Sequence, residues 1–306
     1  MKIVIITEGG RNVGFGHITR CLGLRSELEK KRIEVCFIIN DDVNAAEKIK
    51  GKNFKIYKNN EDILRLVRGS DCAIVDSYIL NKDVYLEIKN SVRLLVSIDD
   101  NKRIEYPPGM VLNGAVYAKD MGFIESDGIT YLLGPEFMPM RQEFVNIDKK
   151  STKENIENIL ISFGGTDFKN MTSKVKDFTS KIFPDATINT IEGDKKIDYV
   201  LRLMQEADIA ISAGGQTLYE LARVGTPALG VCVADNQLNN LKGWEKIGFL
   251  KFCGWYNFEN LFKNIEDALL HVTSKVVRKE MKKSGQSLID GRGAKRVAEK
   301  IIGALN

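Results

Sequence analysis

A single histidine lies in a glycine-rich segment that follows the first apolar run of the chain. Gly14-Phe15-Gly16-His17 comes after the predicted strand Lys2–Ile6, and Arg20 follows almost one helical turn later. Glycines leave the amides of a helix N-terminus unobstructed, and the helix dipole favours an anion there. An imidazole titrates near neutral pH and can serve as a general base. We interpret the segment as an anion-binding loop that carries a base, although a G-x-G pair alone also fits an ordinary turn.

Two other predicted strands of the first half end in carboxylates. Asp76-Ser77-Tyr78 and Asp99-Asp100-Asn101 occupy these positions. Such carboxylates can orient a histidine or hold sugar hydroxyls, and they can equally form Asx turns. The residues leave both readings open. The second histidine, His271, is interpreted as an ordinary position near a helix end.

The second half contains two glycine loops, each between a predicted strand and a predicted helix. They are Phe163-Gly164-Gly165-Thr166-Asp167 and Ser212-Ala213-Gly214-Gly215-Gln216-Thr217. Loops at the carboxyl ends of parallel strands are ligand sites in open α/β sheets, so the pair predicts a diphosphate cradle. No Gly-Lys-Ser/Thr follows either loop, which excludes a P-loop. The helix after the second loop is predicted to stop at Gly225-Thr226-Pro227.

Short apolar runs alternate with amphipathic stretches along the whole chain, as in repeated β-α units around parallel sheets. A helix after the first strand places Ile18, Cys21, Leu22 and Leu28 on one face. We predict an α/β fold with two Rossmann-like domains facing each other across a cleft. The expected strands are Lys2–Ile6, Val35–Ile39, Cys72–Asp76, Leu94–Ile98, Val111–Leu112, Ile159–Ser162, Thr187–Ile191, Asp208–Ser212 and Ala228–Val233.

The apolar pattern weakens around Phe144–Asn158, where the polar run Asn146–Lys153 is the best linker candidate. We therefore expect an N-terminal domain over 1–147 and a C-terminal domain over 148–306. A closing helix over Gly293–Leu305 could pack on either domain.

Composition describes a globular protein, with 43% hydrophobic and 28% charged residues among 306. The net charge of +4 is spread along the chain, which suits small anions and argues against nucleic acid. No apolar run approaches a membrane span or a signal-peptide core, so we expect a cytoplasmic protein without stable membrane association. The five cysteines have no metal spacing and are expected as buried, reduced thiols.

The ordered set of motifs resembles the UDP-sugar hydrolases of pseudaminic acid biosynthesis, which are relatives of the GT-B glycosyltransferases, including the N-acetylglucosaminyltransferase that makes lipid II. The resemblance runs nearly the full length. Besides the loops above, it includes Gly134-Pro135, Met140–Phe144, Asp235-Asn236-Gln237 and Asp290-Gly291-Arg292-Gly293. One departure is Glu136–Pro139, which stands where an aromatic-led segment is usual.

The resemblance implies hydrolysis of UDP-2,4-diacetamido-2,4,6-trideoxy-β-L-altropyranose to UDP and free sugar. The anomeric C–O bond breaks with inversion, and neither a metal nor another cofactor is needed. UDP leaves readily as an anion, so no paired acid of the glycosidase kind is required. The resemblance assigns catalysis to His17, which either positions or activates the water, and to Tyr78 in the same site. Substrate and UDP binding fall to Gly14, Gly16, Arg20, Asp76, Asp99, Gly164, Gly165, Ser212, Gly214, Gly215, Gln216, Thr217, Glu220, Asp235, Asn236 and Gln237.

Two alternatives use the same motifs. A GT-B glycosyltransferase would bind the same UDP-sugar donor and exclude water in favour of an acceptor. A non-catalytic nucleotide-sugar binding protein would keep the loops, but an intact His17 argues against it. The expected assembly is a monomer or weak oligomer acting on a small-molecule substrate.

Overall fold

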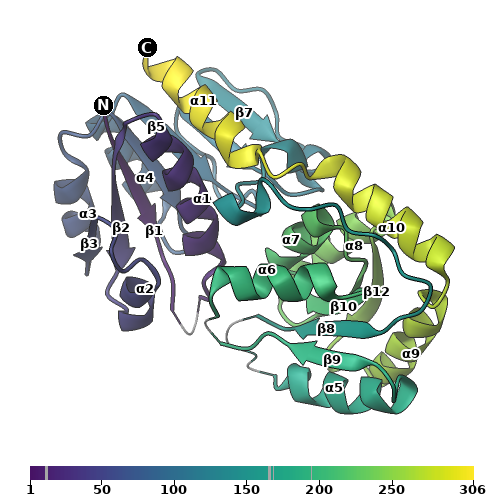
Figure 1. Cartoon of the computed structure of the whole chain (residues 1–306). Coiled ribbons are helices and arrows are strands. Elements are labelled where there is room, and N and C mark those ends of the chain that lie inside the picture. The colour runs from purple at the N-terminus through teal and green to yellow at the C-terminus, as the bar shows by residue number, and fades with distance from the viewer. Residues whose placement is uncertain (11–12, 165–166, 168, 194) are drawn as a thin grey trace. The chain divides into compact units, whose positions relative to one another are not determined.

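Residue contacts divide the chain into two units, shown in the computed structural model of Figure 1. The structure describes residues 1–10, 13–164, 167, 169–193 and 195–306. The first unit comprises Met1–Gln142 and Gly291–Asn306, and the second comprises Glu143–Asp290. The limits 1–147 and 148–306 remain a prediction about independently folding domains.

The first unit contains a parallel sheet in the order β3-β2-β1-β4-β5-β6-β7. The interior strand β1 pairs in register on both sides, with Ile3 opposite Val35 in β2 and Cys72 in β4. Consecutive residues of β1 enter different cores, because Ile3 and Ile5 face one layer while Val4 and Ile6 face the other. The strands are β1 (Lys2–Thr7), β2 (Glu34–Asn40), β3 (Phe54–Tyr57), β4 (Cys72–Asp76), β5 (Leu94–Ile98), β6 (Gly109–Asn113) and β7 (Ile129–Leu133).

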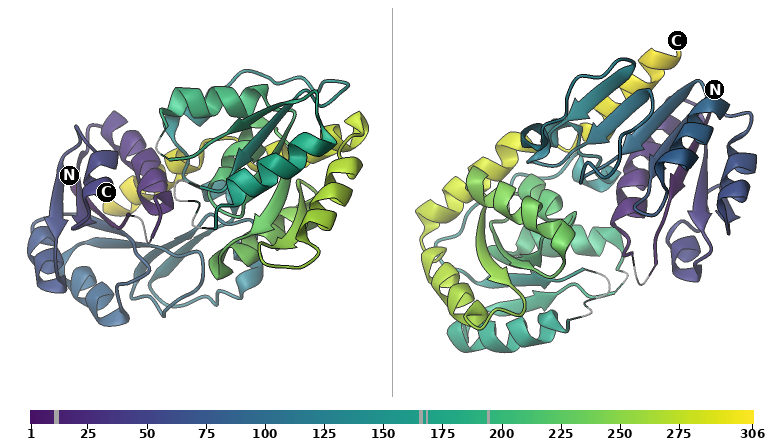
Figure 2. Two further views of the ribbon diagram at one scale, coloured as in Figure 1. Left: turned by 90° about the horizontal axis from the view of Figure 1, so that it is seen from below. Right: turned by 180° about the vertical axis from the view of Figure 1, so that it is seen from behind.

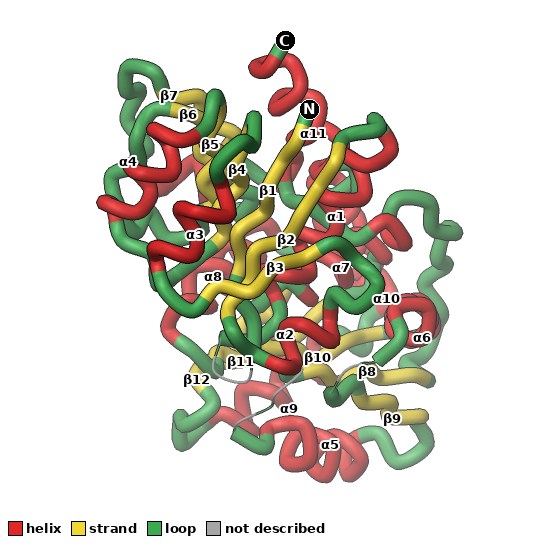
Figure 3. Tube along the Cα trace, turned by 90° about the vertical axis from the view of Figure 1, so that its left-hand side faces the viewer, coloured by secondary structure: helices red, strands yellow, loops and turns green. Residues whose placement is uncertain are grey.

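Helices cover both faces of this sheet, and Figure 3 shows the strands with helices on either side. The helices α3 and α4 supply Ile63 and Tyr85 to one core, and α1 supplies Ile18 and Leu24 to the other. Asparagine side chains cap α3 and α4. The elements are α1 (Gly16–Lys30), α2 (Val43–Lys48), α3 (Asn60–Val67), α4 (Lys82–Ser91), η1 (Ala118–Met121), η2 (Pro135–Phe137), η3 (Gln142–Phe144) and α11 (Gly293–Leu305).

The closing helix α11 belongs to the first unit and packs beside α1 (Figure 2). Its Val297 and Ile301 are fully buried in the same core as Ile3. The helix begins at Gly293, where a Cβ would collide with the backbone of Met138. Only glycine allows the start of α11 to lie this close to the backbone of Met138.

The second unit contains a parallel sheet in the order β12-β11-β10-β8-β9. Its core joins Ile161 and Ile211 from the sheet to Val175 and Ile265 from the covering helices. The strands are β8 (Asn158–Ser162), β9 (Thr187–Thr190), β10 (Ile209–Ala213), β11 (Ala228–Cys232) and β12 (Leu250–Trp255). The helices are α5 (Met171–Ile182), α6 (Ile197–Glu206), α7 (Thr217–Val224), η4 (Asp235–Gln237), α8 (Leu238–Ile247), α9 (Leu261–His271) and α10 (Lys275–Leu288).

The two parallel sheets with covering helices confirm the predicted α/β class and both Rossmann-like halves. The expected stop of α7 is also confirmed, because Gly225 has φ of +82° and ends the helix. All five cysteines are buried and free. A cleft between the domains stays a prediction. In the described part of the chain, no helix has the length and apolarity to cross a membrane.

Candidate active site

His17 lies in the first turn of α1, which begins within the glycine segment at Gly16. Gly14 has φ of +80° and bridges back to Gly10, so the chain reverses just before the helix starts. His17 is 6% exposed, and its Nδ1 lies 2.8 Å from Oδ1 of Asp76. Because the carboxylate accepts, the proton of the neutral ring sits on Nδ1. This leaves the lone pair of Nε2 available as a base.

Arg20 binds the same carboxylate from the next turn of α1. Its Nε and Nη2 each donate to Asp76 at 2.6 Å, and its Nη1 donates to Asp100 Oδ2 at 2.5 Å. Asp76 ends β4 and is fully buried. Planar guanidinium and carboxylate groups form such paired bonds with fixed orientation. The pair therefore fixes the carboxylate that orients His17.

The charges of this cluster shift the pKa values of its members. Burial would lower the pKa of His17, but the charge and hydrogen bond of Asp76 outweigh it, so the pKa lies above the ordinary 6.5. Burial would likewise raise the pKa of Asp76, yet Arg20 and then His17 hold it well below its ordinary value. Asp76 is thus ionised throughout the neutral range, and its negative charge holds the pKa of His17 above the ordinary value.

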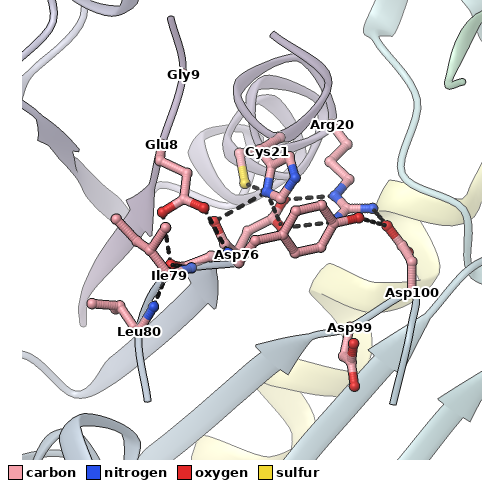
Figure 4. Close-up of polar contacts among 12 residues, drawn as sticks. Glu8, Gly9, Arg20, Cys21, Asp76, Ile79, Leu80, Asp99 and Asp100 are labelled. Atoms are coloured by element: carbon pink, nitrogen blue, oxygen red, sulfur yellow. Dashed lines mark hydrogen bonds and ion pairs between the residues drawn. The ribbon is translucent and has the colours of Figure 1, made fainter. Parts of the chain in front are cut away.

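Tyr78 packs against His17 and is held in place by a buried glutamate. The two rings meet edge to face with centroids 4.4 Å apart, and Tyr78 Oη donates to Asp100 at 3.4 Å. Glu8, at the end of β1, accepts from Ser77 Oγ at 2.7 Å and from the amide of Tyr78 at 2.6 Å. Figure 4 shows Glu8 on one side of Asp76 and Arg20 on the other. Sequence reasoning missed Glu8, although a carboxylate at a strand end was the signal used for Asp76.

Asp99 and Asp100 are adjacent but have different surroundings. Both oxygens of Asp99 accept backbone amides, from Asn101 and Arg103 at 2.9 Å, as in an Asx turn. Burial raises the pKa of Asp99. Asp100 instead joins the cluster through Arg20, and its Oδ1 is buried with no hydrogen-bond partner among the described residues. Asp100, rather than Asp99, is the carboxylate in contact with Arg20 (Figure 4). A substrate role for Asp99 remains a prediction.

In the second unit, the glycine loop after β10 is tied to the segment after β11. The amide of Gly214 donates to Gln237 Oε1 at 3.1 Å, and its carbonyl accepts from Asn240 Nδ2 at 2.8 Å. A Cβ on Gly214 would collide with Leu241 and Gln237, whereas Gly215 faces open space. Asn240, which the sequence did not single out, is buried and also accepts from Tyr219. The predicted residues Gly214 and Gln237 are thus in direct contact.

The other predicted residues of this unit lie near the same sheet edge or beside the loop. Ser212 is buried in β10, and Glu220 is buried in α7 one turn after Thr217. Gln216 precedes α7, which has no side-chain cap. Asp235 and Asn236 are exposed in η4. Gly164 is the second residue after β8 and has φ of +87°, and Gly165 lies outside the described residues.

The first unit contains an oriented base at the uncapped start of α1, and the second unit contains the uncapped start of α7. A histidine held by an ionised carboxylate can take a proton from water or a hydroxyl. Helix N-termini after glycine loops can bind phosphate oxygens. Among the described residues, no group of three or more His, Cys, Asp or Glu side chains is placed to hold a metal ion. Such a site belongs to the class of proteins that act on phosphate-bearing small molecules.

Residues 137–300 match the family model described as the glycosyltransferase family 28 C-terminal domain, and the chain belongs to this family. The first unit supplies the start and the end of the matched range, while all of the second unit lies inside it.

Three curated relatives match the chain in sequence. An uncharacterized protein of Methanocaldococcus jannaschii is 28% identical over 78% of this chain and 56% of its own length. A second relative, from Helicobacter pylori, is named pseudaminic acid cytidylyltransferase and UDP-2,4-diacetamido-2,4,6-trideoxy-β-L-altropyranose hydrolase. It is 30% identical over 87% of this chain and 51% of its own length. The spore coat polysaccharide biosynthesis protein SpsG of Bacillus subtilis is 25% identical over 97% of this chain and 96% of its own length. The chain spans about half the length of the first two.

Solved structures share the fold across the whole chain. MurG of Acinetobacter baumannii superposes with a TM-score of 0.70 at 14% identity, covering 99% of both chains. The glycotransferase of kitacinnamycin gives a TM-score of 0.70 at 15% identity, covering 100% of this chain and 99% of its own. At such identities the likeness establishes the fold, which is that of the GT-B glycosyltransferases, with two Rossmann-like domains.

Proposed function

We propose that this chain hydrolyses UDP-2,4-diacetamido-2,4,6-trideoxy-β-L-altropyranose to UDP and the free sugar, with inversion at the anomeric carbon. The observation that carries the proposal is the buried His17, whose Nδ1 is fixed by Asp76 and whose Nε2 is left to act on water. The Helicobacter pylori relative bears this hydrolase activity in its name, together with a second activity. We further propose that the protein is cytoplasmic and that its reaction needs no cofactor or metal.

In the proposed reaction, the oxygen of a water molecule attacks the anomeric carbon. Nε2 of His17 takes a proton from this water, and the C–O bond to the diphosphate breaks, its electron pair leaving with UDP. Such a base contributes about 10²–10⁴-fold to a rate. The proton then passes from His17 to solvent, which restores the base. Because the anionic diphosphate is a good leaving group, no acid is required to protonate it.

We assign recognition of the sugar to the groups around His17. Oδ1 of Asp100 is buried without a partner among the described residues, and it suits an N–H or hydroxyl donor. The sugar named above carries two acetamido groups, each with one N–H. Tyr78 is placed between His17 and Asp100 by its ring contact and its hydroxyl. Its assigned role is to hold the substrate and the attacking water.

We assign UDP to the second unit. Gly214, Gly215 and the start of α7 would bind the diphosphate through backbone amides, and Glu220 would bind the ribose. Gln237 supports the loop by its bond to the amide of Gly214. The open space around Gly215 leaves room for a phosphate oxygen to approach its backbone.

A glycosyltransferase is the second candidate, since the family model and the similar solved structures are those of glycosyltransferases. In that reaction His17 would deprotonate an acceptor hydroxyl in place of water. The two candidates therefore share the base and the donor, and they differ in the nucleophile.

The test follows release of UDP and free sugar from the purified chain and the UDP-activated sugar, with EDTA and without acceptor. We expect turnover that His17→Asn reduces at least 100-fold while UDP binding persists. The matched control is His271→Asn, because His271 is exposed at the end of α9. Release that requires an added acceptor would establish the transferase and refute the hydrolase. Tight binding without turnover under either condition would indicate a binding protein.

A further inference from the structure

A lysine-lined pocket lies in the second unit, between the segment 150–152 and helix α10. Its volume is about 730 Å³. Figure 1 shows the chain after residue 150 running alongside α10, and Arg278 donates to the carbonyls of Lys153 and Glu154. The lining residues are Lys150, Ser151, Thr152, Lys275, Lys279, Lys282, Lys283, Gln286 and Ser287.

Two of the lining lysines are anchored by hydrogen bonds within the protein. Nζ of Lys150 donates to the carbonyls of Met204 and Ala207 and to Thr226 Oγ1, and Nζ of Lys282 donates to the carbonyl of Lys150. Burial lowers the pKa of Lys150 to about 7 and also lowers the pKa of Lys282. The protonated forms of Lys150 and Lys282 are therefore destabilised by burial, and an anion bound nearby would stabilise them.

The outer wall is one face of α10. Lys275, Lys279 and Lys283 follow one another at intervals of four residues, so they project from the same side of the helix. Lys275 pairs with Glu154 at 2.6 Å. Lys279 and Lys283 are exposed and have no carboxylate partner within the described chain. None of the described lining residues is acidic or aromatic, so positive charge is concentrated there and nothing is offered for stacking a base or a sugar.

The pocket is separate from the glycine loops of the same unit. Lys150 contacts Ala207, which precedes β10, and Thr226, which precedes β11. The loop Gly214–Gly215 follows β10 and so lies at the other end of the parallel strands. We propose that this pocket is a second anion site, which binds a phosphate-rich ligand through Lys279, Lys283 and the hydroxyls of Ser151 and Thr152.

The chemistry of the lining selects the ligand class. Ammonium groups pair with phosphate as point charges, and serine and threonine hydroxyls complete the oxygen shell. A volume of about 730 Å³ exceeds that of one phosphate group and suits several linked phosphates. A free polyphosphate presents several phosphates in one molecule, and a surface of anionic lipids presents several headgroup phosphates side by side.

The experiment titrates the chain with inorganic tripolyphosphate by calorimetry, with UDP present at saturation. In a parallel arm, the chain is sedimented with phosphatidylcholine vesicles that contain or lack phosphatidylglycerol. The test variant is K279Q/K283Q, and the matched control is K176Q/K181Q, which alters two exposed lysines of α5 outside the pocket. Thermal melts check that both variants fold.

We expect saturable binding in at least one arm, weakened about 2- to 30-fold by K279Q/K283Q, since each exposed charge pair is worth a factor of about 1.4 to 5. The control variant should bind as the parent does, and added salt should weaken binding. Binding of tripolyphosphate identifies a free phosphate ligand, and binding to phosphatidylglycerol vesicles alone identifies a lipid headgroup. No saturable binding in either arm, or binding that K279Q/K283Q leaves unchanged, overturns the proposal.

Discussion

Replacing Asp76 by asparagine tests the central pair of the site most directly. The two oxygens of Asp76 face three N–H donors, namely Nδ1 of His17 at 2.8 Å and Nε and Nη2 of Arg20 at 2.6 Å. An asparagine has one acceptor oxygen and one NH₂ group, so at least one of these donors must face another donor. If the NH₂ group faces His17, the ring takes the other tautomer and Nε2 carries the proton. If the NH₂ group instead faces Arg20, the ring keeps its tautomer but the paired bonds that hold the side chain of residue 76 are broken, so the ring is less firmly oriented.

The structure gives the size of two separate effects. Loss of the oriented base should lower kcat by about 10²–10⁴-fold. Breaking a buried ion pair while the other charge stays costs about 3–5 kcal/mol, so the free energy of unfolding should fall by that amount. For a unit of this size, the melting temperature should drop by roughly 6–20 °C. Because the pKa of Asp76 is held below 3.8, its stabilisation is present above that pH and disappears as acid protonates it. The parent and the variant should therefore converge in stability only in strong acid.

UDP release measured below the melting temperature of both proteins gives kcat, and thermal melts from pH 3 to 8 give stability. Asp208→Asn is the matched control, since Asp208 is also buried and, among the described residues, accepts the amides of Glu157 and Asn158 in the other unit. It should lose stability and keep kcat. A kcat for Asp76→Asn within a factor of three of the parent would refute the orienting role of Asp76.

Four further results are expected. Activity should fall as the pH drops through a midpoint above 6.5, because the pKa of His17 is raised and the base is protonated below that pKa. A pH profile of kcat/KM measures the midpoint, and a midpoint below 6 would contradict the prediction. Arg20→Met should move that midpoint upward, since the charge of Arg20 lowers the pKa of His17, and an unchanged midpoint would count against the coupling. Glu220→Ala should weaken UDP affinity more than it changes kcat, as calorimetry and turnover together would show; lost turnover at unchanged affinity would contradict it. Ile301→Ala, fully buried in α11, should cost about 2–5 kcal/mol of stability in denaturant melts, and a loss below 1 kcal/mol would place α11 outside the core.

The central strands of both sheets could be read from the sequence, and several edge strands could not. Cys72–Asp76 and Leu94–Ile98 were predicted with their observed limits, because strands buried on both faces are continuous apolar runs. The missed strands β3, β7 and β12 each lie at an edge of their sheet. In β3, for example, Lys55 and Ile56 are exposed, so the apolar signal is interrupted. The edge strand β9 was predicted one residue too long.

The structure brings several predicted site residues into contact, but these contacts could not be read from the sequence. The sequence identified His17, Arg20 and Asp76 but could not show that both basic groups bind one carboxylate. It also could not separate Asp99 from Asp100, since both follow the same strand and their roles depend on how the turn directs each side chain. The relation between the two units, on which a cleft depends, stays a prediction.

The position of α11 has a consequence for how this chain is made. The core around Ile3 and Ile18 is completed by Val297 and Ile301, nearly three hundred residues later. A ribosome therefore releases the first sheet long before the helix that covers part of it exists, and the whole of Glu143–Asp290 is synthesised in between. Part of the apolar surface of the first unit therefore stays uncovered until α11 has been synthesised. Contacts this distant in sequence are slow to form, because the entropy of closing the loop is lost before burial of apolar surface stabilises the contact. During biosynthesis, the unit that begins the chain is the one expected to be finished last.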